Sequence, residues 1–394
     1  MSDPIVIVGA ARTPLGAMQG ELSDLTASEL GGHAISAALE GAGVEKSDVD
    51  EVLMGCVLPA GQGQAPARQA GFAAGLDKDV PAVTLNKMCG SGMKTVMMAH
   101  DQLKADNGSV LVAGGMESMT KAPYMLPKMR DGARLGHANV VDHMFLDGLE
   151  DAYDKGRLMG SFADECAQKY QLSREAQDEY ALASLDRAQK AQESGAFDAE
   201  ISPITLSTRR GDIVISKDEG PSRARPDKIP QLKPAFNKDG TVTAANASSI
   251  SDGGAALILM RESDAQAKDL NIRARILGHS SHAHEPKWFS TAPVPAMQKL
   301  LKNLGMSVSD VDLWEINEAF AVVPMAAMAE IGMDHSAVNV HGGACAIGHP
   351  IGASGARILV TLLHALEHHD KTTGIASLCI GGGEGTAVAI ERVN

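Results

Sequence analysis

The chain carries two copies of one pattern, and this internal repeat is the feature that most constrains its fold. Residues 43–50 (GVEKSDVD) match residues 305–312 (GMSVSDVD), and SDVD is identical in both. At nearly the same distance after each match, Cys89 and His349 stand in glycine turns that precede a helical pattern. The order of elements recurs as well, which a chance four-residue identity would not produce. The sequence therefore predicts two copies of one α/β unit, with Cys89 and His349 at equivalent positions.

Apolar runs alternate with helical patterns in these copies. In the first copy, strands are expected at residues 5–8, 49–57 and 109–115, and helices at residues 25–39 and 93–103. Short, buried apolar runs separated by helices are typical of parallel sheets. We therefore predict an α/β fold built on a largely parallel sheet.

Residues 118–249, between the two copies, differ in character. They include an expected polar helix at 172–192 and a stretch at 201–245 in which we expect irregular structure. Segment 207–238 holds eight Lys/Arg against four Asp/Glu, which reverses the acidity of a chain with a net charge of −14. This segment is interpreted either as a solvated loop or as a docking surface for a polyanionic cofactor tail.

Charge, cysteine count and hydropathy exclude several classes of protein. The net charge of −14 argues against a nucleic-acid partner. Five cysteines, an odd number, fit reduced thiols better than a disulfide framework. No apolar run approaches the roughly 20 residues that span a bilayer, and MSDPIVIVG at the N-terminus lacks the features of a signal peptide. We expect a cytoplasmic protein without a membrane partner.

Two cysteines and a histidine stand in glycine-rich turns and are candidates for chemistry. Cys89 lies at an expected strand-to-helix turn, where helix N-terminal amides lower the pKa of a thiol and can bind an oxyanion. His349, between a glycine and a proline, is a candidate base for a Cys–His pair. A free cysteine is otherwise often a small buried hydrophobe, and this alternative applies to Cys89 and to Cys379. Together the three residues indicate acyl transfer through a thioester.

Two further patterns near the C-terminus are ambiguous by themselves. The spacing of His341, Cys345 and His349 would suit metal ligation on a helix, but the surrounding glycines and proline disfavour one, so we expect no metal. Asn317 could donate to an oxyanion directly or through water, and Glu318 could orient a histidine. Alternatively, Asn317 is a helix N-cap.

Four motifs in combination resemble those of the thiolases. The motifs are NKMCGSG at 86–92, NEAF at 317–320, GGACAIGHPIG at 342–352 and CIGGG at 379–383. The resemblance extends from AARTP at 10–14 to the C-terminus. It implies the thiolase fold, in which two βαβαβαββ halves form a five-layered αβαβα core. The N-terminal half would comprise residues 1–117 and 250–270, the inserted loop domain 118–249, and the C-terminal half 271–394.

The resemblance also implies roles for individual residues. Cys89 would be the nucleophile that becomes acylated, and His349 would activate it. Cys379 would be the acid/base that moves the proton at the substrate α-carbon. Asn317, through a water, and His349 would form one oxyanion hole, and the backbone amides of Cys89 and Gly381 the other.

CoA and acyl-CoA would be substrates, and no metal or permanently bound cofactor is implied. The residues that the resemblance assigns to CoA binding are Leu149, Arg223, Phe236, Ser248, Ala319 and Phe320. Members of the family are usually homotetramers built from two tight dimers, so the same assembly is expected here.

The implied reaction is 2 acetyl-CoA = acetoacetyl-CoA + CoA. The alternative is a broader 3-oxoacyl-CoA thiolase of fatty-acid or branched-chain breakdown. Leu158 stands where short-chain members commonly have histidine, and Phe289 where they often have methionine. With phenylalanine at position 289, the chain is more similar to the mitochondrial acetoacetyl-CoA thiolases, which accept 2-methyl-branched substrates. These two residues either reshape the acyl pocket or repack against each other.

Two other classes of protein are disfavoured. Decarboxylating condensing enzymes of the same fold typically use a cysteine with two histidines, whereas this chain has the Cys379 motif. A non-catalytic CoA-binding protein would have lost Cys89, His349 or Cys379, and all three are present.

Overall fold

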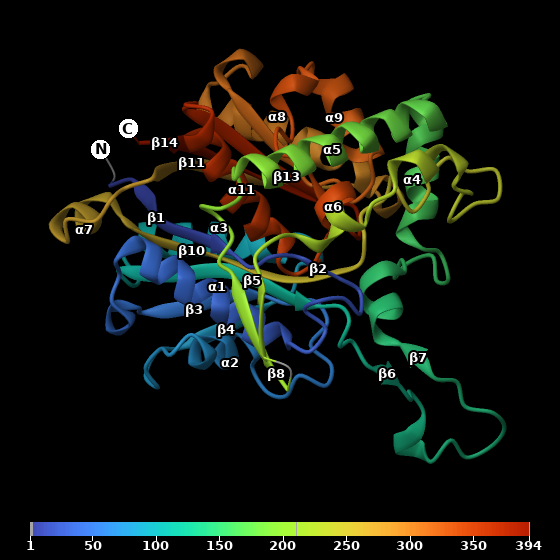
Figure 1. Cartoon of the computed structure of the whole chain (residues 1–394), viewed down its shortest axis with the longest axis horizontal. Helices are drawn as coiled ribbons and strands as arrows, with labels where there is room; N and C mark the ends of the chain where they lie inside the picture. The colour runs from blue at the N-terminus through green and yellow to red at the C-terminus, as the bar shows by residue number, and fades with distance from the viewer. Residues whose placement is uncertain (1–2, 210, 394) are drawn as a thin grey trace.

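The computed structural model, which describes residues 3–209 and 211–393, is built on one sheet whose two halves repeat the same strand order (Figure 1). In the first half the order is β4 (Ala82–Leu85), β3 (Glu51–Gly55), β5 (Val110–Ser118), β10 (Ser251–Arg261) and β1 (Ile5–Arg12). In the second it is β12 (Leu313–Ile316), β13 (Thr373–Ile380), β14 (Glu384–Arg392) and β11 (Ala274–Ala283). A parallel bridge between Trp314 and Val338 takes the place of β4 in the second half. The halves join where β1 pairs with β11 over two residue pairs.

Helices cover both halves of the sheet and fill the space between them (Figure 1). The outer helices are α1 (Ala27–Ala42) and α2 (Pro66–Ala73) on the first half, and α8 (Pro293–Leu304) and α9 (Val322–Ile331) on the second. Helices α3 (Ser91–Lys104) and α11 (Ser354–His368) pack against each other in the middle. Ile5 and Ile7 of β1 face the middle layer, while Val6 and Val8 face α1. The fold is therefore the expected αβαβα arrangement of five layers.

The internal repeat is confirmed in the backbone. Gly43 is the C-cap of α1 and Gly305 that of α8, each in the left-handed conformation with φ of +67°. Each glycine is followed by a 3-10 turn within the repeated SDVD segment, at Lys46–Asp48 in the first copy and Val308–Asp310 in the second. The capping box at Thr26 begins α1 close to the expected position.

The expectation of a largely parallel sheet is wrong. Strand β3 runs parallel to β4 and β5, and β12 runs parallel to β13. Around the centre of the sheet, β10 runs antiparallel to both β5 and β1, and β14 runs antiparallel to both β13 and β11. The last strand of each half thus returns between two earlier ones. Because both faces of these strands are buried, their apolar runs do not distinguish a parallel from an antiparallel neighbour.

The segment between the copies is more regular than the sequence suggested. Helices α4 (Met159–Lys169) and α5 (Arg174–Ser194) pack beside the second half, and α5 confirms the expected polar helix. The stretch 201–245, expected to be irregular, contains a hairpin of β8 (Ile204–Thr208) and β9 (Gly211–Ile215) and the short helix α6 (Glu219–Arg223). Apolar and polar residues alternate in β8 (ITLST) but not in β9 (GDIVI), so only half of the hairpin carries a strand pattern. Arg210, one cation of the basic segment, lies outside the described residues.

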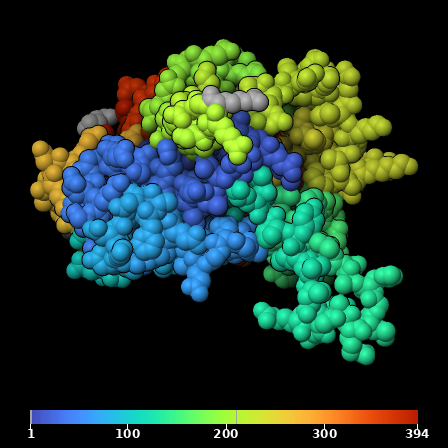
Figure 2. Space-filling model, turned by 60° about the horizontal axis from the view of Figure 1, so that its bottom comes forward, coloured from blue at the N-terminus to red at the C-terminus, as the bar shows by residue number. Residues whose placement is uncertain are grey.

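An arm extends from the body of the molecule (Figure 2). It contains the two-residue strands β6 (Tyr124–Met125) and β7 (Val141–Asp142) and a 3-10 turn at Met129–Asp131. The remaining elements are β2 (Gly16–Ala17), a π-helical turn at Phe145–Leu149, a 3-10 helix at Pro226–Gln231, α7 (Glu262–Ala267), a 3-10 helix at Pro286–Thr291, a 3-10 turn at His335–Ala337 and α10 (Ala344–Ile347). Over residues 3–209 and 211–393, none of the helices has the length and apolar character needed to cross a bilayer.

Helices α3 and α11 approach each other more closely than side chains would allow. A Cβ atom on Gly355 would lie 2.3 Å from the backbone nitrogen of Met93, and one on Gly92 would lie 2.8 Å from that of Ala356. Real Cβ atoms are almost never found so close to other heavy atoms. The middle layer therefore depends on glycine at both crossing points.

We expect Gly355→Ala to lower the free energy of unfolding by about 1–3 kcal/mol, because the added methyl group must push α11 away from α3. Urea unfolding followed by circular dichroism measures this change. Gly41→Ala is the matched control, since a Cβ on Gly41 of α1 meets nothing within 4 Å. That control should leave stability unchanged or raise it by up to ~1 kcal/mol. Equal effects of the two substitutions would contradict the importance of the close crossing.

Candidate active site

Cys89 lies in a strained turn between β4 and α3. The preceding residue, Met88, has a φ of +47°, which is unfavourable for a residue with a Cβ atom. Two polar side chains hold this turn. Asn86 Oδ1 accepts a hydrogen bond from the Met88 amide at 2.9 Å. Ser91 Oγ donates to the Met88 carbonyl at 2.6 Å and accepts from the Lys87 amide at 2.8 Å.

The sulfur of Cys89 lies among backbone donors and is only partly exposed. Burial raises the pKa of Cys89 to about 11, although hydrogen bonds from the amides of Gly381 and of Cys89 itself act in the opposite direction. The sequence argument that a helix N-terminus lowers this pKa is therefore wrong in its net direction, because loss of hydration outweighs the amides. Cys379 is fully buried, and its pKa is also raised, first by burial and then by the charge of Cys89. The two thiols thus share one site.

His349 is oriented by a hydroxyl group that the sequence analysis did not identify. Its Nδ1 lies 2.5 Å from Ser354 Oγ, and that hydroxyl donates to the Pro350 carbonyl at 2.9 Å. Because the hydroxyl proton is used in this way, Ser354 accepts the proton of Nδ1–H, and Nε2 carries the lone pair. Burial, with a smaller contribution from Arg357, lowers the pKa of His349 to about 3. The imidazole is therefore neutral.

Asn317 faces the free nitrogen of His349. Its Nδ2 lies 3.5 Å from His349 Nε2, and its Oδ1 is buried without a hydrogen-bond partner among the described residues. Asn317 is not the N-cap of a helix, because α9 begins at Val322 with Ala321 in the capping position. Its amide is therefore available to the site.

Glu318 does not orient the histidine, contrary to one expectation from the sequence. The four hydrogen bonds that it accepts come from Tyr180 Oη (2.9 Å), Ser184 Oγ (2.8 Å), Asn339 Nδ2 (2.8 Å) and the Cys345 amide (3.0 Å). Two of these donors lie on α5. Glu318 therefore anchors the loop domain to the turn that carries Asn317.

Glu117 is a second residue that the sequence analysis missed. It is fully buried at the end of β5 and accepts hydrogen bonds from the amides of Val57 (2.9 Å), Leu58 (3.1 Å) and Gly352 (2.9 Å). Burial raises the pKa of Glu117 to about 7. It ties the turn after His349 to the loop after β3. The sequence signal that could have identified Glu117 is its position as a single carboxylate at the end of the apolar run 110–116.

Basic side chains gather along a groove beside the loop domain. Arg223, Arg225 and Lys228 line it together with Ala245 and Ser249. Cys345 and Ala346, which follow the glycine pair at 342–343, line the same groove. The concentration of positive charge favours the docking-surface interpretation of segment 207–238 over that of a plain solvated loop.

The other residues assigned to CoA binding fall into two groups. The Ser248 amide donates to the Ala319 carbonyl at 3.0 Å, and the ring of Phe236 meets that of Phe320 edge-on at 5.9 Å. Leu149 packs against the apolar cluster that Cys89 also contacts. The structure therefore brings Ser248, Ala319, Phe320 and Phe236 together, and places Leu149 near Cys89.

Phe289 and Leu158 do not form a simple repacked pair. Phe289 is buried in a cluster that includes Phe320, whose ring lies 6.3 Å away, and the partly buried Met159. Leu158 precedes α4, is partly exposed and is not a member of this cluster. Phe289 instead extends the apolar wall formed by Phe236 and Phe320.

His341, Cys345 and His349 do not converge on one point. His349 Nδ1 is directed at Ser354, Cys345 Sγ at the Glu318 carbonyl and His341 Nε2 at His369. The intervening helix α10 has only four residues. The three side chains therefore contact different partners, although they are close together in the sequence.

Comparisons with known proteins agree with this geometry. The family model described as "Thiolase, N-terminal domain" matches residues 5–263, and "Thiolase, C-terminal domain" matches residues 270–392. The chain is 50% identical over 390 residues to an acetyl-CoA acetyltransferase of Cupriavidus necator, covering 98% of this chain and 99% of that protein. It is 50% identical over 391 residues to one of Escherichia coli, covering 99% of each.

Solved structures give the same result. The crystal structure of the Bacillus anthracis acetyl-CoA acetyltransferase superposes with a TM-score of 0.96 at 42% identity, covering 100% of this chain and 99% of that one. The Acat5 thiolase from Ascaris suum, solved in complex with coenzyme A, superposes with a TM-score of 0.94 at 39% identity, covering 99% and 100% respectively.

The resting Cys89 and His349 are expected to form a neutral thiol–imidazole pair, because burial raises the pKa of the thiol to about 11 and lowers that of the imidazole to about 3. The rate of Cys89 alkylation by iodoacetamide, followed by peptide mass spectrometry, should therefore keep rising between pH 7 and pH 10 as the thiolate fraction grows. A rate that is already constant above pH 7 would contradict the neutral pair and indicate a thiolate–imidazolium pair.

Proposed function

Because the chain belongs to the thiolase family, we propose that its Cys89 site catalyses reversible acyl transfer between 3-oxoacyl-CoA and CoA, with the reaction 2 acetyl-CoA = acetoacetyl-CoA + CoA as its principal activity. The observation that supports this proposal is that the Cys89 and Cys379 thiols and the Gly381 amide lie together, with Cys89 packed against the apolar cluster that also holds Ile351, two residues after His349. His349 carries its lone pair on Nε2, which Asn317 Nδ2 faces at 3.5 Å. The relatives named acetyl-CoA acetyltransferase match the whole chain, which disfavours the broad-range alternative.

In the degradative direction, His349 Nε2 takes the proton of Cys89 as the sulfur attacks the 3-keto carbon of the substrate. The bond between the α- and β-carbons then breaks and leaves the acyl group on Cys89. The departing acetyl-CoA enolate takes a proton from Cys379. The thiol of a second CoA finally attacks the thioester, and its proton restores the enzyme.

In the synthetic direction the same groups act in reverse order. Cys89 attacks acetyl-CoA as His349 takes its proton, CoA leaves with a proton from Cys379, and Cys89 is acetylated. The Cys379 thiolate then removes an α-proton from a second acetyl-CoA, and the carbanion attacks the carbonyl carbon of the acetyl group. The bond from that carbon to the Cys89 sulfur breaks, and the released thiolate recovers its proton from His349. The amides of Cys89 and Gly381, which hydrogen-bond the Cys89 sulfur, would stabilise the oxyanion of the acylated residue. Asn317, through a water, and His349 would serve the second oxyanion.

We assign the groove at Arg223, Arg225 and Lys228 to the phosphate-bearing end of CoA. Three cations in one groove suit a ligand with several phosphate charges. Phe236, Phe289 and Phe320 form an apolar wall that would lie along the acyl and pantetheine portion. CoA acts here as a substrate, and none of the proposed steps requires a metal or a permanently bound cofactor.

The proposal also covers the oligomeric state of the protein and its location in the cell. Large apolar side chains are exposed along the arm, and these are Tyr124, Leu126, Met129, Leu135 and Val140. Exposed apolar surface of this kind favours contact with other subunits, which supports a homotetramer made of two dimers. We also propose that residues 1–117 and 250–270 form the N-terminal half, 118–249 the inserted loop domain and 271–394 the C-terminal half. A cytoplasmic location is part of the same proposal, and the five free cysteines among the described residues are consistent with it.

Thiolysis by the purified protein tests the proposed reaction, and we expect acetoacetyl-CoA to be cleaved with a higher kcat/KM than a C8 3-oxoacyl-CoA. Loss of the enolate absorbance in the presence of CoA is the measurement. The 2-methyl derivative of acetoacetyl-CoA, run alongside, reports the influence of Phe289 on the acyl pocket. Equal or faster turnover of the C8 substrate would assign the chain to the broader degradative class.

Cys89→Ala should abolish both thiolysis and the covalent acetylation detected by mass spectrometry. Cys379→Ala should still become acetylated at Cys89 but lose acetoacetyl-CoA formation by about 10²–10⁴-fold, because only the proton transfer is removed. Cys166→Ala, which removes a buried thiol outside the proposed mechanism, is the control and should retain both reactions. Full acetylation of Cys89→Ala would overturn the assignment of the nucleophile.

The combined change Arg225→Ala/Lys228→Ala should raise KM for acetyl-CoA about tenfold, since charge-assisted contacts with phosphate are lost. It should leave the kinetics with S-acetylpantetheine, which lacks the nucleotide, unchanged. Lys190→Ala/Lys302→Ala removes the same charge from exposed positions and controls for net charge. An equal effect on both substrates would contradict docking of the nucleotide in this groove.

A further inference from the structure

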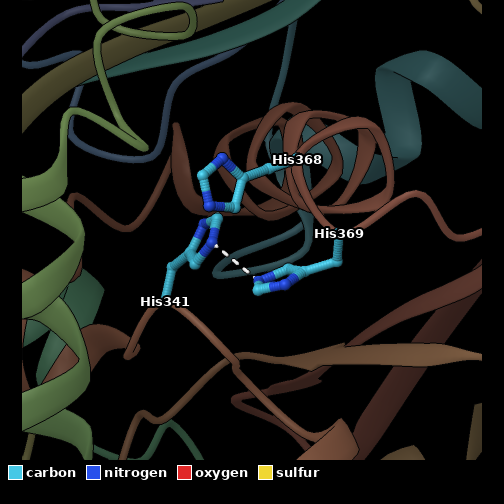
Figure 3. Close-up of side chains that lie close together, drawn as sticks. All are labelled: His341, His368 and His369. Atoms are coloured by element: carbon cyan, nitrogen blue, oxygen red, sulfur yellow. Dashed lines mark hydrogen bonds between the residues drawn. The ribbon is translucent and has the colours of Figure 1, made fainter.

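Three histidines meet on the side of the molecule where α11 ends (Figure 3). His341 precedes the glycine pair at 342–343, His368 is the last residue of α11, and His369 is its C-cap. One potential ligand atom from each lies within 4.8 Å of the other two. The ring centroids are separated by 5.4 Å for His341–His368, 5.1 Å for His341–His369 and 4.9 Å for His368–His369.

The contacts of His341 are incomplete for a buried imidazole. The residue is 4% exposed, and its Nδ1 has no hydrogen-bond partner among the described residues. Its Nε2 faces His369 Nε2 at 3.1 Å, so that two ring nitrogens point at each other. A neutral imidazole has one proton and one lone pair. A cation bound by both lone pairs would satisfy these nitrogens better than one shared proton.

We propose that His341, His368 and His369 form a binding site for a divalent transition-metal ion of the Zn²⁺ type. Imidazole nitrogen is a preferred ligand of such ions, and three protein ligands with an open fourth position form a known type of zinc site. With Zn–N bonds of about 2.0–2.1 Å and tetrahedral angles, ligand nitrogens lie about 3.3 Å apart. The His341–His369 separation already has this value within a few tenths of an ångström.

The surroundings suit a metal ligand. His341 packs edge-on against Phe197 at 5.7 Å, which fixes one face of its ring. Burial lowers the pKa of His341 to about 4, with neighbouring histidines acting in the same direction and Glu200 in the opposite one. The lone pair of His341 is therefore available at neutral pH. His368 and His369 are exposed, so their rings can turn toward a common ion and leave the fourth position to water.

The cluster is separate from the proposed active site. Ser354, which contacts His349, begins α11, and His368 ends it 14 residues later. At 1.5 Å per residue the two ends lie roughly 20 Å apart. The bound ion would therefore not touch the reacting groups. It would link His341, in the segment that precedes the turn carrying His349, to the C-terminal end of α11.

A second group of potential ligands is the main competitor. His100, Asp101 and His279 also lie close enough to hold an ion. In that group both imidazoles already contact the same carboxylate oxygen, at 3.0 and 2.8 Å. The ring nitrogens that face Asp101 are thus paired with a carboxylate without a metal, whereas His341 Nε2 faces only another imidazole and its Nδ1 has no partner among the described residues. The experiment separates the two groups.

Zn²⁺ titration by calorimetry tests the proposal on chain without a polyhistidine tag, treated with EDTA and then freed of it. Every protein carries Cys89→Ala/Cys345→Ala, which removes the two partly exposed thiols of the described residues as rival ligands. We expect one Zn²⁺ to bind, and His368→Ala/His369→Ala to weaken binding by about 100-fold or more, since loss of an outer-shell partner alone costs about 10–100-fold. Co²⁺ should give the intense visible absorption of a tetrahedral complex, and the double variant should lose it.

His137→Ala, at an exposed histidine of the arm, is the matched control and should bind Zn²⁺ like the parent. His100→Ala should also leave this binding intact. The proposal is overturned if the parent binds no Zn²⁺, if His368→Ala/His369→Ala retains full affinity, or if His100→Ala alone removes it. Because thiolysis is measured separately on chain with Cys89, failure of the metal site leaves the proposed reaction unaffected.

Discussion

The close crossing of α3 and α11 is the constraint on which the active site depends. Gly92 and Gly355 allow the two helices to touch through their backbones, and Gly115 allows β5 to approach the carbonyl of Gly352. Each helix begins after a turn that carries a proposed catalytic group, Cys89 before α3 and His349 before α11. Bringing the helices together therefore brings the turns together. A side chain at these crossings would separate the halves of the molecule and, with them, the turns that carry Cys89 and His349.

Burial, rather than an ion pair, sets the electrostatic state of the site. The thiols of Cys89 and Cys379 and the imidazole of His349 are all shifted toward their neutral forms, because each loses water and none has a strong counter-charge within reach. Hydrogen bonds from two amides to the Cys89 sulfur offset only part of this cost. These two amides would stabilise the substrate most strongly when negative charge develops on its oxygen in the transition state, as electrostatic catalysis requires. Proton transfer from Cys89 to His349 is therefore expected to accompany attack rather than to precede it.

The sequence predicted the parts of the fold that local patterns encode. The SDVD repeat located the two halves, and the glycine turns located Cys89 and His349. Strand direction was predicted wrongly because β10 and β14 are buried on both faces, and an apolar run carries no information about its neighbour's direction. The hairpin β8–β9 was missed because only β8 (ITLST) alternates apolar and polar residues, whereas its partner β9 (GDIVI) does not.

Side chains that act through long-range contacts could not be predicted in the same way. Glu117 and Gly352 are separated by 235 residues, and Glu318 meets Tyr180 across 138. The sequence left open that Glu318 orients a histidine, but its carboxylate accepts hydrogen bonds from Tyr180 and Ser184 of α5 instead. Only the fold decides which of two neighbouring polar residues faces the site. The roles of individual site residues therefore remain predictions that the kinetic experiments test.

Helix α11 connects the two chemical features of the second half. Its first residue, Ser354, fixes the tautomer of His349, and its last, His368, belongs to the histidine cluster. Residues 354–366 are buried throughout, so this helix is held rigidly along its length. An ion that joined His341 to its far end would close the segment 341–369 into a loop, reducing the freedom of the chain on both sides of the catalytic turn. Its effect should therefore appear in the stability of this segment, while proton transfer at His349 continues to depend on Ser354 and Asn317.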